Sequence, residues 1–116
     1  MNSPAGYPET QNRKLVGWRA ALMLDGASSP LFGRTLEASE QSMVILSEHN
    51  VAAGTECRIC LDVTDSTGRR GYLDFRGVVN NATLVGKLSQ FRLTCRIVTM
   101  DAQQREFLSG AVRQES

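Results

Sequence analysis

The sequence has little of what catalysis requires. Its 116 residues include one histidine, His49, which stands beside Asn50 in a stretch of turn-forming residues. A lone turn histidine is most often a solvated surface residue, and no Ser-His-Asp or Cys-His set can be assembled around it. The glycines form neither a G-x-G-x-x-G fingerprint nor a phosphate-binding P-loop. We therefore expect no catalytic residues and no enzyme activity.

Cysteine is scarce too. Three cysteines are an odd number, which is not a disulfide framework in a chain of this size. Cys57 and Cys60 match the C-x-x-C pattern, but residues three apart on a strand point to opposite faces and cannot grip one metal. We expect no metal site, and we interpret Cys57 and Cys95 as small core residues.

Long apolar runs and an excess of one charge are also missing. No run approaches the roughly 20 residues of a membrane span, and the first ten residues hold no apolar core of a signal peptide. These absences predict a cytoplasmic protein without membrane insertion. Thirteen basic residues face twelve acidic ones, which argues against a general binder of nucleic acid polymers.

The basic residues are nearly all arginine, because only Lys14 and Lys87 are lysine. The planar fork of arginine suits phosphate groups and guanine edges, whereas lysine offers a point charge. A GC-rich genome would give the same bias. Both explanations of the arginine content stay open at this point.

What the sequence does have is apolar–polar alternation with period two, which is typical of β-strands. The strands that this pattern predicts span residues 16–24, 31–36, 43–47, 57–63, 70–80 and 91–98. Turn-forming residues separate them, and residues 82–89 are interpreted as a loop. Short strands with regular turns predict a small antiparallel β-barrel.

At Asp101 the period changes to that of a helix. Asp101 is expected to cap the helix N-terminus, with Gln104 at the reciprocal capping-box position. The apolar stripe that follows at helical spacing consists of Phe107, Leu108, Ala111 and Val112. A helix of about three turns must dock to be stable, so we expect it to plug one mouth of the barrel or to cover one side.

The predicted fold is therefore mainly β, a small antiparallel barrel followed by a C-terminal α-helix. Residues 13–113 are expected to form a single domain. Residues 1–12, which contain two prolines, one glycine and almost nothing to bury, are expected to be a flexible tail. Residues 114–116 are expected to be a short C-terminal tail.

Two segments combine polar side chains in a way that indicates ligand binding. The first is the basic pair Arg13 and Lys14, with Arg19 a few residues later. The second is the turn between the predicted second and third strands, where Glu37 and Ser39 are followed by Ser42 in the pattern E-x-S-x-x-S.

This order of segments resembles the PilZ domain, a bacterial receptor module for cyclic di-GMP. The resemblance covers about residues 13–112 and implies a six-stranded barrel with a terminal helix. In that family an R-x-x-x-R motif precedes the first strand, and D/N-x-S-x-x-G lies between the second and third strands. The arginines contact guanine and phosphate, the acidic or amide residue and the serine hold another edge of the ligand, and the glycine lets the backbone turn close to it.

The resemblance implies a cyclic di-GMP site made of Arg13, Lys14, Arg19, Glu37, Ser39 and Ser42. Both motifs are altered here. Glu37 has a carboxylate that is one carbon longer, Ser42 replaces the glycine, and Arg13 and Arg19 stand six residues apart where the family has four. If the backbone at Ser42 has a positive φ, a non-glycine residue costs about 1 kcal/mol there and its Cβ crowds the ligand.

Two residue assignments have alternatives. Trp18 either stacks on a guanine or is the large core residue of the first strand. Glu37 and Ser39 either bind the ligand or bond to nearby turn backbone.

Two hypotheses of function follow. In the first, the chain is a cyclic di-GMP receptor that passes the second-messenger signal to a protein partner. In the second, it is a PilZ-like adaptor that does not bind cyclic di-GMP and acts only through protein–protein contacts. Neither hypothesis requires a separate cofactor.

Overall fold

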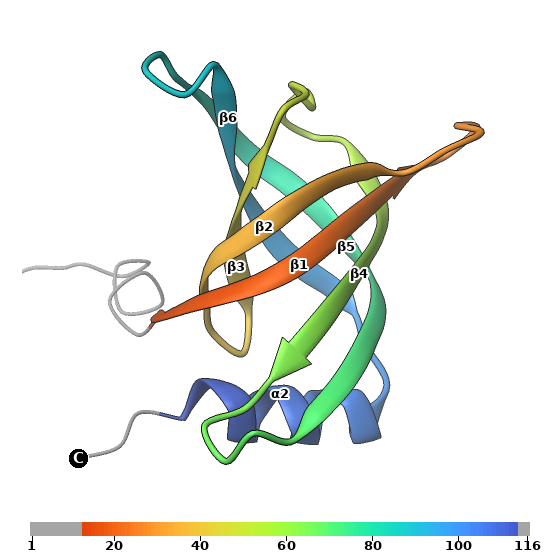
Figure 1. Cartoon of the computed structure of the whole chain (residues 1–116). Helices are drawn as coiled ribbons and strands as arrows, with labels where there is room; N and C mark the ends of the chain where they lie inside the picture. Colours follow the sequence, from red (N-terminus) through yellow and green to blue (C-terminus); the bar gives the residue numbers. More distant parts are fainter. Residues whose placement is uncertain (1–12, 114–116) are drawn as a thin grey trace, which may run out of the picture.

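The computed structural model describes residues 13–113, which form six strands and one helix (Figure 1). The elements in chain order are β1 (Lys14–Leu24), β2 (Leu31–Ala38), β3 (Ser42–Ser47), β4 (Glu56–Thr64), β5 (Arg70–Val85), β6 (Gln90–Thr99) and α2 (Ala102–Val112). The predicted tails, residues 1–12 and 114–116, lie outside the described residues.

The six strands close into a barrel in the order β1-β2-β3-β6-β5-β4. Every neighbouring pair is antiparallel. Two of these pairs join strands that are distant in sequence, since β6 lies beside β3 and β4 lies beside β1. This architecture confirms the predicted six-stranded antiparallel barrel with a C-terminal helix.

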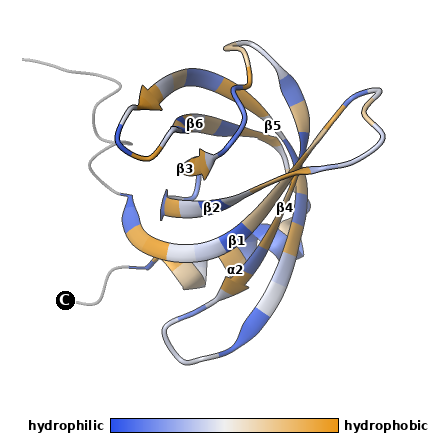
Figure 2. Cartoon of the chain, turned by 45° about the horizontal axis from the view of Figure 1, so that its top comes forward, coloured by the Kyte–Doolittle hydropathy of each residue, from blue (hydrophilic) through white to orange (hydrophobic). Residues whose placement is uncertain are grey.

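The barrel interior holds the core. Successive side chains of a strand point to opposite faces, so most strands have one apolar face and one polar face. β3 is the exception, since Met43 to Leu46 are apolar on both faces. On β4, Cys57, Ile59, Leu61 and Val63 are buried inside, which confirms the predicted core position of Cys57. The same alternation of apolar and polar residues is visible along the strands in Figure 2.

The structure corrects the predicted loop at residues 82–89. β5 runs on to Val85, and Ala82 to Val85 pair with the first residues of β6. The register between β5 and β6 shifts between Val79 and Asn81. A β-bulge absorbs an extra residue without ending a strand. The polar residues that appeared to break the strand therefore mark a bulge, and the loop is only the short turn that includes Ser89 with a φ of 53°.

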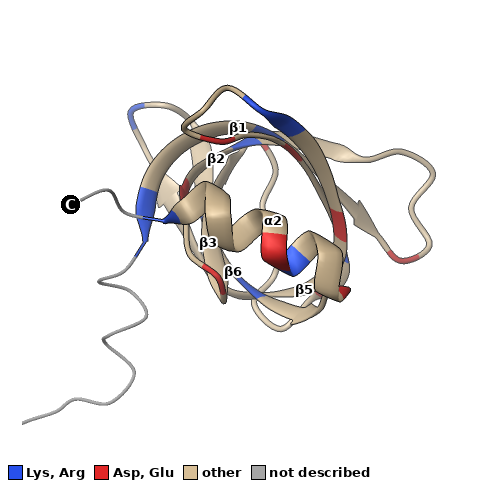
Figure 3. Cartoon of the chain, turned by 90° about the horizontal axis from the view of Figure 1, so that it is seen from below, with Lys and Arg blue, Asp and Glu red and all other residues tan. Residues whose placement is uncertain are grey.

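The helix α2 lies across one mouth of the barrel (Figure 3). Its residues Leu108, Ala111 and Val112 are buried with the barrel core, as the apolar stripe predicts. Asp101 caps it, because Asp101 Oδ1 accepts a hydrogen bond from the Gln104 amide at 2.8 Å. Within residues 13–113, no helix is long and apolar enough to cross a membrane.

The Gln104 side chain reaches back to Asp101, as the capping-box position predicts, but its Nε2 donates to Asp101 Oδ2 at 2.9 Å and its oxygen does not accept from the Asp101 backbone amide. Its side-chain oxygen instead accepts a hydrogen bond from the backbone amide of Asp74 on β5. The β5–β6 ladder begins only at Arg76, so the Asp74 amide has no partner on β6. The Gln104 side chain satisfies that amide, and α2 is thereby tied to β5.

Replacement of Gly33 tests whether β2 and β3 approach each other closely at this position. A Cβ at this position would collide with the backbone carbonyl oxygen of Leu46, which cannot move without disturbing the ladder. We expect Gly33→Ala to lower the free energy of unfolding by about 1–3 kcal/mol, as overpacking does. Urea denaturation would measure the loss.

The matched control is Gly86→Ala, because a Cβ at Gly86 meets nothing within 4 Å. Its stability should stay close to that of the unmodified chain. Equal stability of the two variants would show that the strands do not approach each other as described.

Candidate functional site

The turn between β2 and β3 is built around the Ser39 hydroxyl. Ser39 Oγ accepts hydrogen bonds from the backbone amides of Gln41 at 3.2 Å and Ser42 at 3.1 Å. The Ser39 amide in turn donates to the Ser42 carbonyl at 2.8 Å. Ser39 is only 3% exposed. Its hydroxyl therefore shapes the turn, which agrees with the turn-chemistry alternative for this residue.

Arg13 reaches this turn because β1 runs antiparallel to β2. Lys14 pairs with Ala38, so the residue that precedes β1 lies beside the end of β2. Arg13 Nε donates a hydrogen bond to Ser42 Oγ at 3.0 Å. Arg13 Nη1 also lies 3.8 Å from Glu37 Oε1, and its side chain is only 10% exposed. The structure thus brings together three of the predicted residues, Arg13, Glu37 and Ser42.

Arg92 is a member of this cluster that sequence reasoning did not assign. It lies on β6 opposite Leu46 of β3, and its Nη2 donates to Glu37 Oε2 at 3.0 Å. The Glu37 carboxylate is therefore held between two guanidinium groups. Alternation places Arg92 on the outer face of its strand, but only the β3–β6 pairing shows that it reaches Glu37. We call Arg13, Glu37, Ser42 and Arg92 the turn cluster.

Ser42 carries no backbone strain. Within residues 13–113, Ser89 is the only non-glycine residue with a positive φ. The cost expected for a serine in the place of the family glycine therefore does not arise. Ser42 is 2% exposed, and its hydroxyl accepts the Arg13 hydrogen bond. The serine adds a contact that a glycine could not make.

The structure does not bring Lys14 and Arg19 into the turn cluster. Lys14 Nζ lies 3.4 Å from the Ala111 carbonyl oxygen near the end of α2, where a cation also meets the negative end of the helix dipole. Arg19 lies further along β1, opposite Arg34 of β2 and Asp62 of β4. Arg19 therefore lies on another part of the barrel surface than Arg13.

Trp18 is a core residue. It is 5% exposed, and its indole Nε1 donates to the Thr64 carbonyl at 3.2 Å. The apolar ring is buried, and its one polar atom has a hydrogen-bond partner inside the protein. Of the two alternatives for Trp18, the structure supports the core position.

The thiols lack the features of nucleophiles. Cys57 is buried and Cys60 half-buried, on opposite faces of β4. Burial raises the pKa of both thiols, and it raises the pKa of Cys95 to about 12. The thiolate is the reactive form of cysteine, and these shifts favour the protonated thiol of all three side chains.

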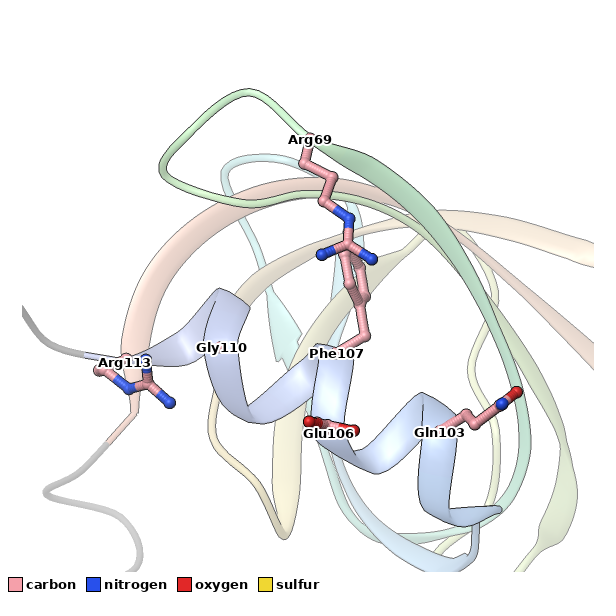
Figure 4. Close-up of a pocket in the computed structure, with 6 residues that line it drawn as sticks. All are labelled: Arg69, Gln103, Glu106, Phe107, Gly110 and Arg113. Carbon is pink, nitrogen blue, oxygen red and sulfur yellow. The ribbon is translucent and has the colours of Figure 1, made fainter.

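A hollow lies elsewhere, between α2 and the β4–β5 hairpin (Figure 4). Its volume is about 540 Å³. It is lined by Arg69, Gln103, Glu106, Phe107, Gly110 and Arg113. The Arg69 guanidinium stacks over the Phe107 ring, 5.3 Å from its centroid, and this cation–π contact fixes the hairpin against the helix. None of the predicted site residues lines this hollow.

Two solved structures of bacterial proteins are similar to this chain. The first is the inhibitor of motility MotI/DgrA from Bacillus subtilis, with a TM-score of 0.69 and 10% sequence identity, over 84% of this chain and 45% of that one. The second is the PilZ domain with c-di-GMP of YcgR from Escherichia coli, with a TM-score of 0.62 and 17% identity, over 83% of this chain and 79% of that one. This chain thus spans less than half the length of the Bacillus protein.

At these identities the likeness establishes the fold alone. No protein-family model matches the chain, and no curated protein matches it in sequence.

Replacement of Ser39 tests whether its hydroxyl builds the turn. Ser39→Ala leaves the buried Ser42 amide without an acceptor, so we expect a loss of about 1–3 kcal/mol in the free energy of unfolding. Chemical denaturation would report it. Ser66→Ala, at an exposed position of the β4–β5 turn, should leave stability nearly unchanged. A Ser39→Ala variant as stable as the Ser66→Ala variant would contradict the structural role.

Proposed function

We propose that this chain, which has the fold of a PilZ domain, is a receptor that binds cyclic di-GMP at the turn cluster. The observation that carries the proposal is the convergence of Arg13, Glu37 and Ser42 from two separate segments, with Arg92 added from a third. The first two segments are those in which the PilZ resemblance locates ligand contacts. The similar Escherichia coli domain is described together with c-di-GMP.

Each member of the turn cluster has a role that its chemistry suits. The Arg13 and Arg92 guanidinium groups would donate paired hydrogen bonds to phosphate oxygens. The Glu37 carboxylate accepts only, so it would receive the N–H groups of a guanine edge. The Ser42 hydroxyl would stay on Arg13 and orient it. Ser39 would act through the turn it shapes rather than through contact with the ligand.

Ligand binding would be read out through α2. Lys14, next to Arg13, is bonded to the Ala111 carbonyl. On the other side of the turn cluster, Arg105 of α2 donates to the Glu40 carbonyl at 3.4 Å. A ligand that moves Arg13 or the β2–β3 turn therefore acts on these two contacts of the helix. We propose the exposed face of α2 as the surface that a protein partner senses.

One observation favours the alternative of an adaptor that does not bind cyclic di-GMP. Arg13 is already satisfied by Glu37 and Ser42 and is largely buried. Without ligand, the cluster is a closed network with no unpaired charge at Arg13. In an adaptor, this network would serve to fix β1 to the turn, and α2 would still face a partner.

Calorimetric titration with cyclic di-GMP at moderate salt separates the two functions. A receptor should bind in the micromolar range or tighter. Arg13→Ala removes a charged donor whose hydrogen bonds contribute about 1.5–3 kcal/mol, so it should weaken binding roughly tenfold or more. Arg92→Ala should act in the same direction.

Lys87→Ala is the control. Lys87 is an exposed cation in the β5–β6 turn, and this turn lies at the end of the barrel opposite α2 (Figure 1). Its affinity should equal that of the unmodified chain. Absence of heat with the unmodified chain at high concentrations of both components would rule out the receptor and leave the adaptor.

A further inference from the structure

A second hollow lies on the outer face of the barrel where β1 runs between β2 and β4. Its volume is about 480 Å³. It is lined by Gly17, Trp18, Arg19, Arg34, Asp62, Thr64 and Arg70. We call it the arginine hollow. It shares no residue with the turn cluster or with the hollow beside α2.

The strand register concentrates positive charge in the arginine hollow. Arg19 stands directly opposite Arg34 on β2 and opposite Asp62 on β4. Arg70, from the start of β5, reaches Asp62 with contacts of 2.8 and 3.1 Å. Like charges placed directly opposite each other on neighbouring strands destabilise a sheet. The fold therefore tolerates an unfavourable pair at this position.

The charges of the arginine hollow are not balanced among residues 13–113. Arg34 is oriented by a hydrogen bond from its Nη1 to the Gly17 carbonyl at 2.9 Å, and it forms no ion pair with another residue of this range. The single carboxylate, Asp62, is engaged by Arg70. Arg19 makes no hydrogen bond or ion pair with any residue in the range 13–113. Three cations and one anion leave two positive charges.

Gly17 leaves space beside the Arg34 guanidinium. A Cβ at this position would stand 3.7 Å from Arg34 Nη1, so a longer side chain would extend into the hollow. Thr64 contributes a hydroxyl group that can accept or donate. The hollow thus combines free guanidinium donors, a neutral hydroxyl and room for a ligand.

We propose that the arginine hollow binds a small molecule through a phosphate monoester group. Such a group carries a charge of about −1.5 to −2 at neutral pH, which matches the two unbalanced positive charges better than the single charge of a carboxylate does. Guanidinium groups bind phosphate oxygens in pairs. The volume exceeds that of a phosphate group, so an organic portion can occupy the remainder.

Inorganic phosphate is the probe for the test, with acetate as the carboxylate comparison. NMR spectra of the arginine Nε–Hε groups would be followed at low ionic strength during each titration. We expect saturable shifts of the Arg19 and Arg34 signals with phosphate, and at least tenfold weaker binding of acetate. Arg19→Gln, which breaks no hydrogen bond or ion pair within residues 13–113, should weaken phosphate binding tenfold or more.

The matched control is Arg96→Gln, an exposed arginine on β6 outside the arginine hollow; it should bind phosphate like the unmodified chain. Gly17→Glu supplies a second test, since its carboxylate would occupy the hollow and weaken phosphate binding. Arg13→Ala should leave phosphate binding intact, which separates this site from the proposed cyclic di-GMP site. Non-saturable shifts, equal affinity for acetate, or equal losses in the Arg19 and Arg96 variants would overturn the proposal.

Discussion

The pairing of β3 with β6 is the constraint on which the turn cluster depends. The chain does not pair β3 with the strand that follows it, because β4 closes the barrel against β1. Only this arrangement sets Arg92 beside Glu37, and only the β1–β2 ladder sets Arg13 beside the same carboxylate. Three chain segments therefore meet at one carboxylate. The residue before β1 and the sequential strands β2 and β3 supply Arg13, Glu37 and Ser42, and the β3–β6 pairing adds Arg92.

The strength of the Glu37 ion pairs with Arg13 and Arg92 decides whether a ligand can displace the Glu37 carboxylate. Ion pairs that solvent reaches contribute about 0–1 kcal/mol each, and Glu37 and Arg92 are both partly exposed. Displacement of Glu37 from Arg92 therefore costs a phosphate ligand about 1 kcal/mol or less. Arg13 is more deeply buried, so its replacement requires some opening of the turn.

The sequence allowed much of the fold to be predicted, because the signals are local. Alternation located all six strands, and Asp101 located the start of α2. The end of β5 was predicted wrongly, since Asn80 and Asn81 have the composition of a turn while the backbone accommodates them in a bulge. A bulge depends on the register with the partner strand, which period-two alternation does not specify.

The site was only partly predictable, because its geometry comes from pairing between distant strands. Arg13, Glu37 and Ser42 meet, as their positions around the β1–β2 hairpin imply. Arg92 could not be assigned without the β3–β6 register, and Arg19 was placed in the site although it faces Arg34 and Asp62. The cost expected at Ser42 assumed a positive φ that the turn does not have, because Ser39 stabilises it differently.

The central claim is that cyclic di-GMP binds where Arg13, Glu37, Ser42 and Arg92 meet. A titration followed by backbone amide NMR tests it most directly, since it maps the ligand onto the chain. The account predicts that the largest shifts occur at Arg13, in residues 37–42 and at Arg92, with smaller shifts along α2. Shifts centred on the arginine hollow or on the hollow beside α2, with the turn cluster unchanged, would contradict it.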